Sequence, residues 1–349
     1  MLDSLGFVDA VSGLPEQLAA ARASTAEALA GVALPGAGDL TSIAVLGMGG
    51  SGISGDVLAA AASGELCLPV VVHKQIRTPA YIGPRTLVFA VSYSGDTEET
   101  VAMTRGAIEA GARVVTVSSG GELARMAADA GAVHVPCPAG YMPRAAIGTL
   151  IAPILGTLGA IGLLADTDAR IDAAVHALAR RRDASTRDVA APANLAREVA
   201  RRIDGTIPLI YGGGAIGGVA AMRWKCDINE NAKAPAFWAA YPELDHNEIC
   251  GWGQHGDVTR QLISIVELRH DHEHARLAPR IDATRDLIDE AVHQVIPVAA
   301  AGEGRLAQLL DLMYLGDWTS VHLAADRGVD PGPIDAIATL KGILGTPEG

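Results

Sequence analysis

The sequence predicts an α/β protein built on two doubly wound parallel sheets. Short apolar strands alternate with helical segments, which is the pattern of a parallel sheet covered by helices. A strand that runs into a glycine-rich turn occurs twice, at residues 43–52 and 208–218, and this indicates an internal repeat of one α/β unit. The length of 349 residues suits two domains of ordinary size.

The first unit is predicted to span residues 1–165. A helix starting near Leu14 precedes a Gly/Pro turn, and the alternation of strands and helices begins after it. The strands are expected at 43–46, 70–73, 86–91, 113–117 and 133–135, with helices at 54–62, from about 97 to 110, and at 122–130. Each strand is a short apolar run between turn residues, as expected for strands buried inside a sheet.

Residues 145–165 carry no charged side chain over about the length that spans a bilayer. The stretch is rich in Gly, contains Pro153, lacks an aromatic belt and has only Arg144 as a basic flank, so we interpret it as a buried helix. The N-terminus is acidic and lacks the basic region of a signal peptide. The four Cys have no CxxC spacing, and we expect a cytoplasmic protein with reduced thiols.

Residues 166–200 are rich in Ala, Arg and Asp and are predicted to form a surface helix and linker. The second unit then covers 201–349 and repeats the pattern of the first. Its expected elements are the strand and turn at 208–218, strands at 262–268 and 294–298, and helices at 282–292, 305–325 and 333–343.

The formal net charge of −13 argues against binding to nucleic acid or to an anionic membrane surface. A small anionic ligand remains compatible with this charge if local donors hold it. Residues 47–52 match the GxGxxG pattern after a strand. A nicotinamide-binding unit needs an acid at the end of its second strand, but His73 and Lys74 stand there. A helix N-terminus with free N–H groups and Ser51 suits a phosphate instead.

A second loop with the same character follows the third strand. Ser92, Ser94 and Thr97 place three hydroxyls at the positive end of a helix dipole. Hydroxyls and backbone amides can hold a phosphate dianion without Lys or Arg, which fits the acidic chain. Helix capping is the alternative, but a cap needs only one hydroxyl. We therefore predict a phosphate site here.

The stretch 224–253 combines three of the four Trp with a concentration of titratable side chains. Titratable groups packed among large aromatics are the setting in which carboxylates and imidazoles shift their pKa for proton transfer, although ion-pair networks can look the same. Pro235 and Pro242 break the stretch into short pieces. Its titratable and amide-bearing residues include Glu230, Lys233, Glu243, Asp245, His246, Asn247 and Glu248.

Two further features allow more than one interpretation. Arg144 opens the uncharged stretch, where a lone Arg is either a domain-linking salt bridge or an active-site cation, and the residues leave both open. The run 269–274, R-H-D-H-E-H, has the side chains of a metal site, but we interpret it as a solvated loop after a strand. No metal site is predicted.

The combined motifs resemble the bifunctional phosphoglucose/phosphomannose isomerase family, which consists of two sugar-isomerase (SIS) domains of flavodoxin-like topology. The blocks N-E-N and H-N-E together are specific to that family, whereas G-G-S-G alone indicates only a SIS domain. The matching segments, in the family's order from about Gly47 to Lys341, are G-G-S-G-I-S-G-D, S-Y-S-G-D-T-E-E-T, P-R-A-A-I-G, N-E-N-A-K-A-P-A-F, P-E-L-D-H-N-E and G-V-D-P-G-P-I-D-A-I-A-T-L-K.

The resemblance implies roles for particular residues. The catalytic glutamate matches Glu230, and the family's arginine, histidine and C-terminal lysine match Arg144, His246 and Lys341. The residues matching the sugar 6-phosphate site are Gly50, Ser51, Ser92, Ser94 and Thr97. Family members are dimers in which the histidine reaches the neighbouring subunit's site, and they need no cofactor or metal.

Two positions depart from the family's usual residues. Asp96 stands where Asn is common, and it adds a negative charge near the expected phosphate unless it points away. Gly332 stands where Thr is common, near the sugar end of the site. The activity implied is metal-independent interconversion of glucose 6-phosphate or mannose 6-phosphate with fructose 6-phosphate through an enediolate. A non-catalytic SIS protein that binds a sugar phosphate and regulates a partner is the alternative.

Overall fold

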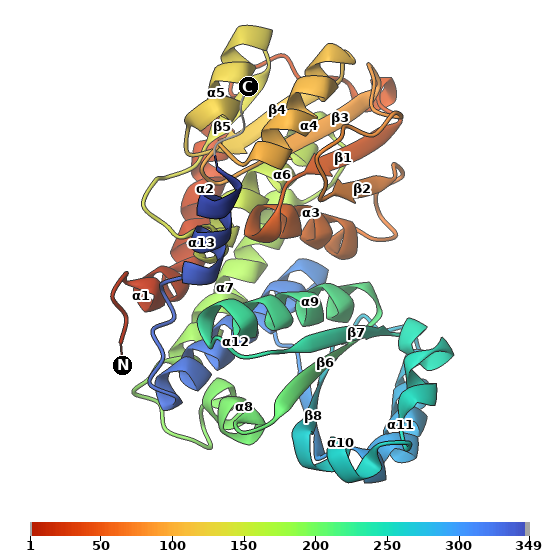
Figure 1. Ribbon diagram of the computed structural model, residues 1–349. Helices are drawn as coiled ribbons and strands as arrows, with labels where there is room; N and C mark the ends of the chain where they lie inside the picture. The colour runs from red at the N-terminus through yellow and green to blue at the C-terminus, as the bar shows by residue number, and fades with distance from the viewer. Residues whose placement is uncertain (1, 346–349) are drawn as a thin grey trace.

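Two lobes, each built on one parallel sheet, form the computed structural model, which describes residues 2–345 (Figure 1). The first sheet has the strand order β2-β1-β3-β4-β5 and the second has the order β7-β6-β8-β9. The strands are β1 (Ser42–Leu46), β2 (Val70–His73), β3 (Thr86–Val91), β4 (Arg113–Ser118), β5 (Val133–Pro136), β6 (Ile207–Gly213), β7 (Phe237–Tyr241), β8 (Ile263–Arg269) and β9 (Gln294–Ala299).

The strand orders confirm the predicted fold class. The first sheet has the order 2-1-3-4-5, which is that of flavodoxin-like doubly wound folds. The second sheet repeats the first four positions of that order, as an internal repeat requires. All strand pairs in both sheets are parallel, and in the first sheet Ile43 lies opposite Val70 on one side and Leu87 on the other.

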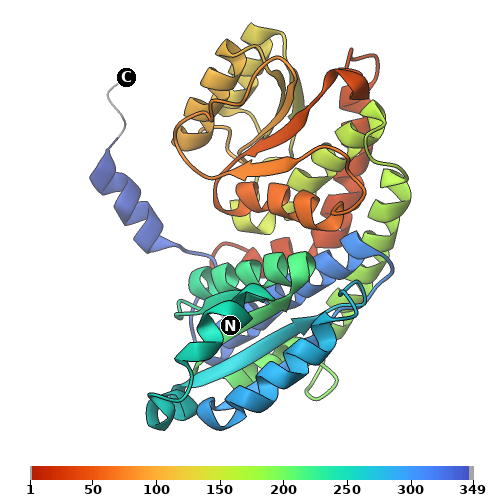
Figure 2. The ribbon, with the colours of Figure 1, turned by 90° about the vertical axis from the view of Figure 1, so that its right-hand side faces the viewer.

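Helices cover both sheets and fill the space between the lobes. Those in or beside the first lobe are α1 (Phe7–Ser12), α2 (Leu14–Leu29), α3 (Gly49–Ala61), α4 (Glu98–Glu109), α5 (Gly121–Ala130) and α6 (Ile147–Ile161). The others are α7 (Thr167–Ser185), α8 (Leu195–Ile203), α9 (Gly214–Asn231), α10 (Gly256–Leu262), α11 (Leu277–Ile288), α12 (Arg305–Asp326) and α13 (Asp335–Leu344). Helix α3 packs against α9 and α12, so these helices join the lobes (Figure 2).

Several element limits differ from the sequence predictions. Helix α3 begins at Gly49 rather than near residue 54, because the glycine-rich motif itself forms the first helical turns. Helix α11 begins at Leu277, five residues before the predicted start. Trp224 lies in the long helix α9, so the stretch 224–253 is not made only of short pieces. Strand β7 and helix α10 were not predicted.

The uncharged stretch forms helix α6, with Pro153 inside it. Its residues are buried almost throughout, against α2 and α3, which confirms the prediction of a buried helix. No helix within residues 2–345 has the length and apolar character needed to cross a membrane. Residues 166–200 form helix α7 and the start of α8, and α7 packs on α12 and α2 rather than serving only as a surface linker. The domain limits of 1–165, 166–200 and 201–349 stay a prediction.

Helix α13 has no buried residue. It extends away from both lobes at the end of the described chain (Figure 2). Its first turn nevertheless contributes to a cavity beside Glu230, described below.

Candidate active site

The glycine-rich turn after β1 lies directly against the segment that carries Arg144. A Cβ atom on Gly50 would lie 3.0 Å from the carbonyl oxygen of Pro143 and 3.2 Å from the Cα of Arg144. A side chain here would crowd the backbone of Pro143 and Arg144, so a glycine suits this close approach. Ser51, in the first turn of α3, is buried, and its Oγ accepts a hydrogen bond of 3.1 Å from the backbone N–H of Tyr93. The two predicted phosphate loops are therefore joined.

The loop between β3 and α4 holds its hydroxyls close to the start of the helix. The hydroxyls of Ser92 and Thr97 are 2.8 Å apart and bond to each other, while Ser94 is exposed. Thr97 is the N-cap residue of α4, but its side chain accepts no hydrogen bond from the helix backbone. Thr97 therefore does not cap α4 through its side chain, whereas the Ser92 and Ser94 hydroxyls accept hydrogen bonds from backbone N–H groups of the loop, both at 3.2 Å. Gly95 has φ +80°, and a Cβ there would lie 1.9 Å from the carbonyl oxygen of Gly120.

Asp96, one of the two positions that depart from the family's usual residues, forms a hydrogen bond with the start of helix α5. Its Oδ1 accepts a hydrogen bond of 2.8 Å from the backbone N–H of Glu122, in the first turn of α5. Its backbone N–H donates to Ser94 Oγ at 3.2 Å. The Asp96 carboxylate is thus held by the neighbouring helix N-terminus, which favours negative charge.

Arg144 is buried between the lobes, with 4 % of its surface exposed. Its Nε donates to Asn231 Oδ1 at 2.8 Å, and its Nη2 donates to the carbonyl oxygens of Pro331 and Gly332, both at 2.6 Å. Within residues 2–345, Nη1 has no hydrogen-bond acceptor, so it is the donor left for a ligand. The ring of Phe7 lies 4.6 Å from the guanidinium carbon. Burial lowers the pKa of Arg144 and Glu230 opposes this, but an Arg stays protonated.

Glu230, near the end of α9, is the carboxylate that pairs with Arg144. Its Oε2 lies 3.9 Å from Arg144 Nε, and 31 % of its side chain is exposed. It lines a cavity of about 500 Å³ together with the chain segment that leads into α13. The structure therefore unites two sequence-predicted residues that are far apart in the chain, and the backbone around Gly332 completes the contact with Arg144.

The aromatic surroundings predicted for Glu230 are not observed. No Phe, Tyr or Trp is among the described residues that line its cavity. Trp224 is buried near the middle of α9, where its indole N–H donates to the Leu312 carbonyl at 2.7 Å. Phe237 and Trp238 are 58 % and 41 % exposed on the edge strand β7. The prediction was wrong because residues that are close in the sequence lie on different elements. Glu230 is on helix α9, whereas Phe237 and Trp238 are on the edge strand β7.

Lys233 was noted in the sequence but not assigned to the site. Its Nζ donates to the carbonyl oxygens of Glu230 and Asp330, each at 2.8 Å. It has φ 52°, an uncommon conformation for a residue with a side chain. Burial lowers the pKa of Lys233, and the nearby positive charge of Arg144 lowers it further. Lys233 thus ties the end of α9 to the segment that accepts hydrogen bonds from Arg144.

A buried ion network behind the site was also not predicted. Arg223 Nη2 donates to Asp317 Oδ1 at 2.8 Å and to the backbone carbonyl of Arg144 at 2.6 Å. Arg223 Nε lies 2.9 Å from Asp227 Oδ2, and all three charged side chains are nearly inaccessible. Burial alone would lower the pKa of Arg223, but Asp227 and Asp317 outweigh it and raise the pKa. The network links α9, α12 and Arg144.

His246 and Lys341 are not brought to Glu230 within this chain. His246 ends the short helix η3 (Glu243–His246) after β7, and it is exposed. Lys341 is exposed on α13, one turn after the cavity-lining residue Ile337. Residues four apart on a helix share a face, so Lys341 is on the side of α13 that begins at the cavity. The roles of both residues stay predictions.

The histidine-rich run forms a loop after β8 in which Asp271, His272 and His274 are exposed, as predicted, but one of its histidines is not solvated. His270 is buried, and one of its ring nitrogens lies 2.8 Å from the carbonyl oxygen of Gly213. Glu273 accepts hydrogen bonds from Arg269 at 2.8 to 3.1 Å. The part of the chain that the structure describes contains no group of three His, Cys, Asp or Glu side chains arranged to hold a metal ion.

Comparison with known proteins identifies the family. Residues 192–344 match the family described as the bacterial phospho-glucose isomerase C-terminal SIS domain. The chain is 36 % identical over 306 residues to the bifunctional phosphoglucose/phosphomannose isomerase of Caldicellulosiruptor bescii, covering 88 % of this chain and 90 % of that one. The chain belongs to the bifunctional phosphoglucose/phosphomannose isomerase family. The phosphoglucose/phosphomannose isomerase of Aquifex aeolicus is 32 % identical, over 87 % of this chain and 91 % of its own.

The fold agrees with this membership. A glucose-6-phosphate isomerase-like protein from Thermus thermophilus superposes with a TM-score of 0.59 at 20 % identity, covering 92 % of this chain and 94 % of that one. At that identity the likeness shows the fold alone. Membership of the phosphoglucose/phosphomannose isomerase family makes the chain an isomerase, and the assignment of its site residues depends on the geometry described above.

Proposed function

We propose that the chain is an aldose–ketose isomerase that interconverts glucose 6-phosphate, mannose 6-phosphate or both with fructose 6-phosphate, without a metal or cofactor. The observation that carries the proposal is the juxtaposition of Glu230 and Arg144 at 3.9 Å, next to two loops that suit a phosphate. We infer the sugar phosphate substrates from the names of the relatives, and we infer the catalytic mechanism from the residues of this chain.

The reaction moves a proton between carbons 1 and 2 of the open sugar through an enediolate. It needs a carboxylate base, and the partly exposed Glu230 can reach a substrate in its cavity. It also needs a cation where oxyanion charge develops. Nη1 of Arg144, which has no hydrogen-bond acceptor among the described residues, supplies that donor, and such a preorganised group contributes about 3 kcal/mol to transition-state stability. The hydrogen bonds to Asn231 and Gly332 hold the guanidinium in place.

Both aldose phosphates can use the same base. Glucose 6-phosphate and mannose 6-phosphate differ only in configuration at carbon 2, and the enediolate is planar there. A site that allows rotation about the carbon 2–carbon 3 bond therefore serves both epimers with Glu230 alone. Dual specificity needs space, and the cavity beside Glu230 measures about 500 Å³, within the range of small-molecule sites.

The assay that tests the proposal uses pure protein and fructose 6-phosphate without added metal or nucleotide. We expect glucose 6-phosphate, mannose 6-phosphate or both as products. A protein that binds fructose 6-phosphate but forms neither aldose would instead be the non-catalytic regulator. Formation of product only with a nicotinamide cofactor would contradict both interpretations.

The phosphate loops give the first prediction. Ser94→Ala combined with Thr97→Ala should raise KM for fructose 6-phosphate about tenfold or more, because two hydroxyl donors to the phosphate are lost, and tenfold corresponds to about 1.4 kcal/mol. Steady-state kinetics measure this. The pair Thr41→Ala and Ser63→Ala, which removes two exposed hydroxyls elsewhere, serves as the control. An unchanged KM in the folded Ser94/Thr97 variant would contradict the assignment.

Metal removal gives the second prediction. Exhaustive chelation with EDTA should leave turnover unchanged, because we assign the stabilisation of enediolate charge to Arg144. The measurement is turnover of fructose 6-phosphate before and after dialysis against chelator. Loss of activity that zinc restores would point instead to the histidine-rich segment 269–274.

We further propose a homodimer in the cytoplasm in which His246 assists ring opening in the neighbouring subunit's site, together with Lys341. The exposure of His246 and Lys341 is compatible with this arrangement. Mixing inactive Glu230→Gln and His246→Ala subunits should then restore part of the activity, because one of the two mixed sites would have both groups intact. Activity of the mixture that stays at the level of the separate variants, in a verified heterodimer, would rule out sharing across subunits.

A further inference from the structure

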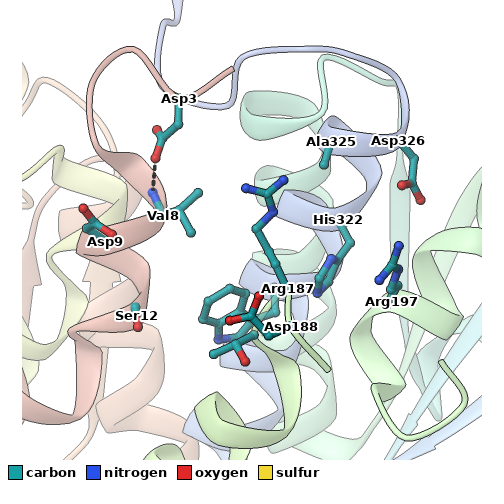
Figure 3. A pocket seen from close by; sticks show the side chains of 12 residues that line it. Asp3, Val8, Asp9, Ser12, Arg187, Asp188, Arg197, His322, Ala325 and Asp326 are labelled. Atoms are coloured by element: carbon teal, nitrogen blue, oxygen red, sulfur yellow. Dashed lines mark hydrogen bonds between the residues drawn. The ribbon is translucent and has the colours of Figure 1, made fainter. Parts of the chain in front are cut away.

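A second cavity, of about 720 Å³, lies between α1, the loop that follows α7, and the last turns of α12 (Figure 3). It shares no lining residue with the cavity beside Glu230. Its size is within the range of small-molecule sites. The proposed isomerase chemistry does not use any of its side chains, so its polar lining calls for a separate explanation.

Two arginines line this cavity without ion-pair partners among residues 2–345. Arg187 lies on the loop after α7, and Arg197 lies on the first turn of α8. Neither guanidinium forms a salt bridge or a side-chain hydrogen bond with any residue in the range 2–345, whereas most other arginines of the chain do. Figure 3 shows both side chains beside His322. Arginine is well suited to bind carboxylate or phosphate through paired N–H groups.

Side chains of Asn194 and His322 hold the loop that carries Arg187 in place. The side-chain amide of Asn194, which is fully buried, donates to the carbonyl oxygens of Ser185 and Thr186 at 3.1 and 3.0 Å. Its Oδ1 accepts from the backbone N–H of Arg197 at 3.0 Å and so caps α8. A ring nitrogen of His322 lies 2.8 Å from the Ser185 carbonyl. Hydrogen bonds from buried side chains therefore fix the position of this wall of the cavity.

Carboxylates line the same cavity as the arginines and limit the kind of ligand. Asp9, Asp188 and Asp326 are exposed at the cavity, so a simple anion would meet repulsion as well as attraction. A molecule with one anionic group and several hydroxyls satisfies both sets, because its hydroxyls donate to carboxylates while its anion binds the guanidiniums. We propose that this cavity is a second ligand site for a small hydroxylated anion, a polyol phosphate or sugar-acid phosphate, which acts on the active site through α1.

Helix α1 supplies the physical connection. Asp9 and other residues in or just before α1 line the second cavity. Phe7, in the same helix, is fully buried, and its ring lies 4.6 Å from the Arg144 guanidinium carbon. Just before the helix, the backbone N–H of Ser4 donates to Asp330 Oδ2 at 3.0 Å, next to the segment that Arg144 binds. A ligand that binds between α1 and α12 therefore contacts the element that packs on Arg144.

Calorimetry tests the binding. The probes are inorganic phosphate, glycerol 3-phosphate and 6-phosphogluconate, titrated into the full chain. We expect a site for at least one hydroxylated probe that remains in the Ser94→Ala, Thr97→Ala variant and is weakened tenfold or more in Arg187→Gln, Arg197→Gln. The matched control is Arg105→Gln, Arg276→Gln, which removes the same charge from two exposed arginines without ion pairs among the described residues. Equal affinity in the Arg187/Arg197 variant, or no binding of any probe, would overturn the site.

Steady-state kinetics test whether the bound ligand affects the active site through α1. This experiment rests on the proposed isomerase activity, whereas the calorimetry does not. A saturating probe should change KM or kcat for fructose 6-phosphate about fivefold or more in the wild type. The change should disappear in Arg187→Gln, Arg197→Gln. Inhibition of equal size in that variant would mean that the probe acts only at the active site. A probe that binds through the arginines but leaves KM and kcat unchanged would overturn the action through α1.

Discussion

Glu230→Gln is expected to lower turnover of fructose 6-phosphate by at least about 10²–10⁴, the contribution of a general base. The substitution keeps the shape of the side chain but removes the group that accepts the proton from carbon 1 or carbon 2. Because Glu230 is 31 % exposed and makes only a 3.9 Å contact with Arg144, the change should leave the fold intact. The loss should therefore appear in kcat much more than in KM.

Exchange of solvent deuterium separates this step from ring opening. The Gln variant should not exchange deuterium at carbon 1 of fructose 6-phosphate, because that exchange requires the base. His246→Ala should slow reaction of cyclic sugars but leave exchange on a short open-chain phosphate substrate largely intact. Glu109→Gln, a change of the same chemistry at an exposed carboxylate, is the matched control. Exchange at the wild-type rate in Glu230→Gln would mean that another carboxylate is the base, and Glu243 or Glu248 would be tested next.

The central strands β1 and β3 were predictable because each is a short apolar run that is buried in its own sheet. Ile43 and its neighbours in β1 are completely buried, and their sequence shows this directly. Helix starts were less predictable, since Gly49 and its neighbours have low helix propensity yet begin α3. Strand β7 was missed because it is an edge strand whose aromatic residues Phe237 and Trp238 are exposed, so its sequence lacks the pattern of a buried strand.

The site was only partly predictable from the residues, because its contacts join segments that are distant in the chain. The sequence left Arg144 as either a salt bridge between domains or an active-site cation. The structure gives it both features: it binds Asn231, 87 residues away, and the carbonyl of Gly332, and it keeps Nη1 unbonded within the described chain. No periodic pattern encodes such contacts. Arg223 and Asp227 are four residues apart on one helix, but Asp317, 94 residues from Arg223, could not be paired with them from sequence.

Arg223→Met is expected to lower the free energy of unfolding by about 3–5 kcal/mol, the usual cost of removing one partner from a buried ion network. The substitution leaves the carboxylates of Asp227 and Asp317 buried without their counter-charge. It also removes the hydrogen bond to the Arg144 carbonyl, so residual folded enzyme should turn over more slowly. Urea unfolding of the full chain measures the first effect, and kcat at low temperature measures the second.

Two further variants distinguish the loss of charge pairing from the loss of packing. Adding Asp227→Asn and Asp317→Asn to Arg223→Met should recover much of the stability, because no buried charge then remains without a partner. Activity should not recover with it, since the bond to the Arg144 carbonyl is still absent. Arg201→Met, which breaks the exposed pair with Glu198, should change stability little, because such pairs contribute little. A triple variant as unstable as Arg223→Met would show that side-chain packing, and not charge, makes Arg223 necessary.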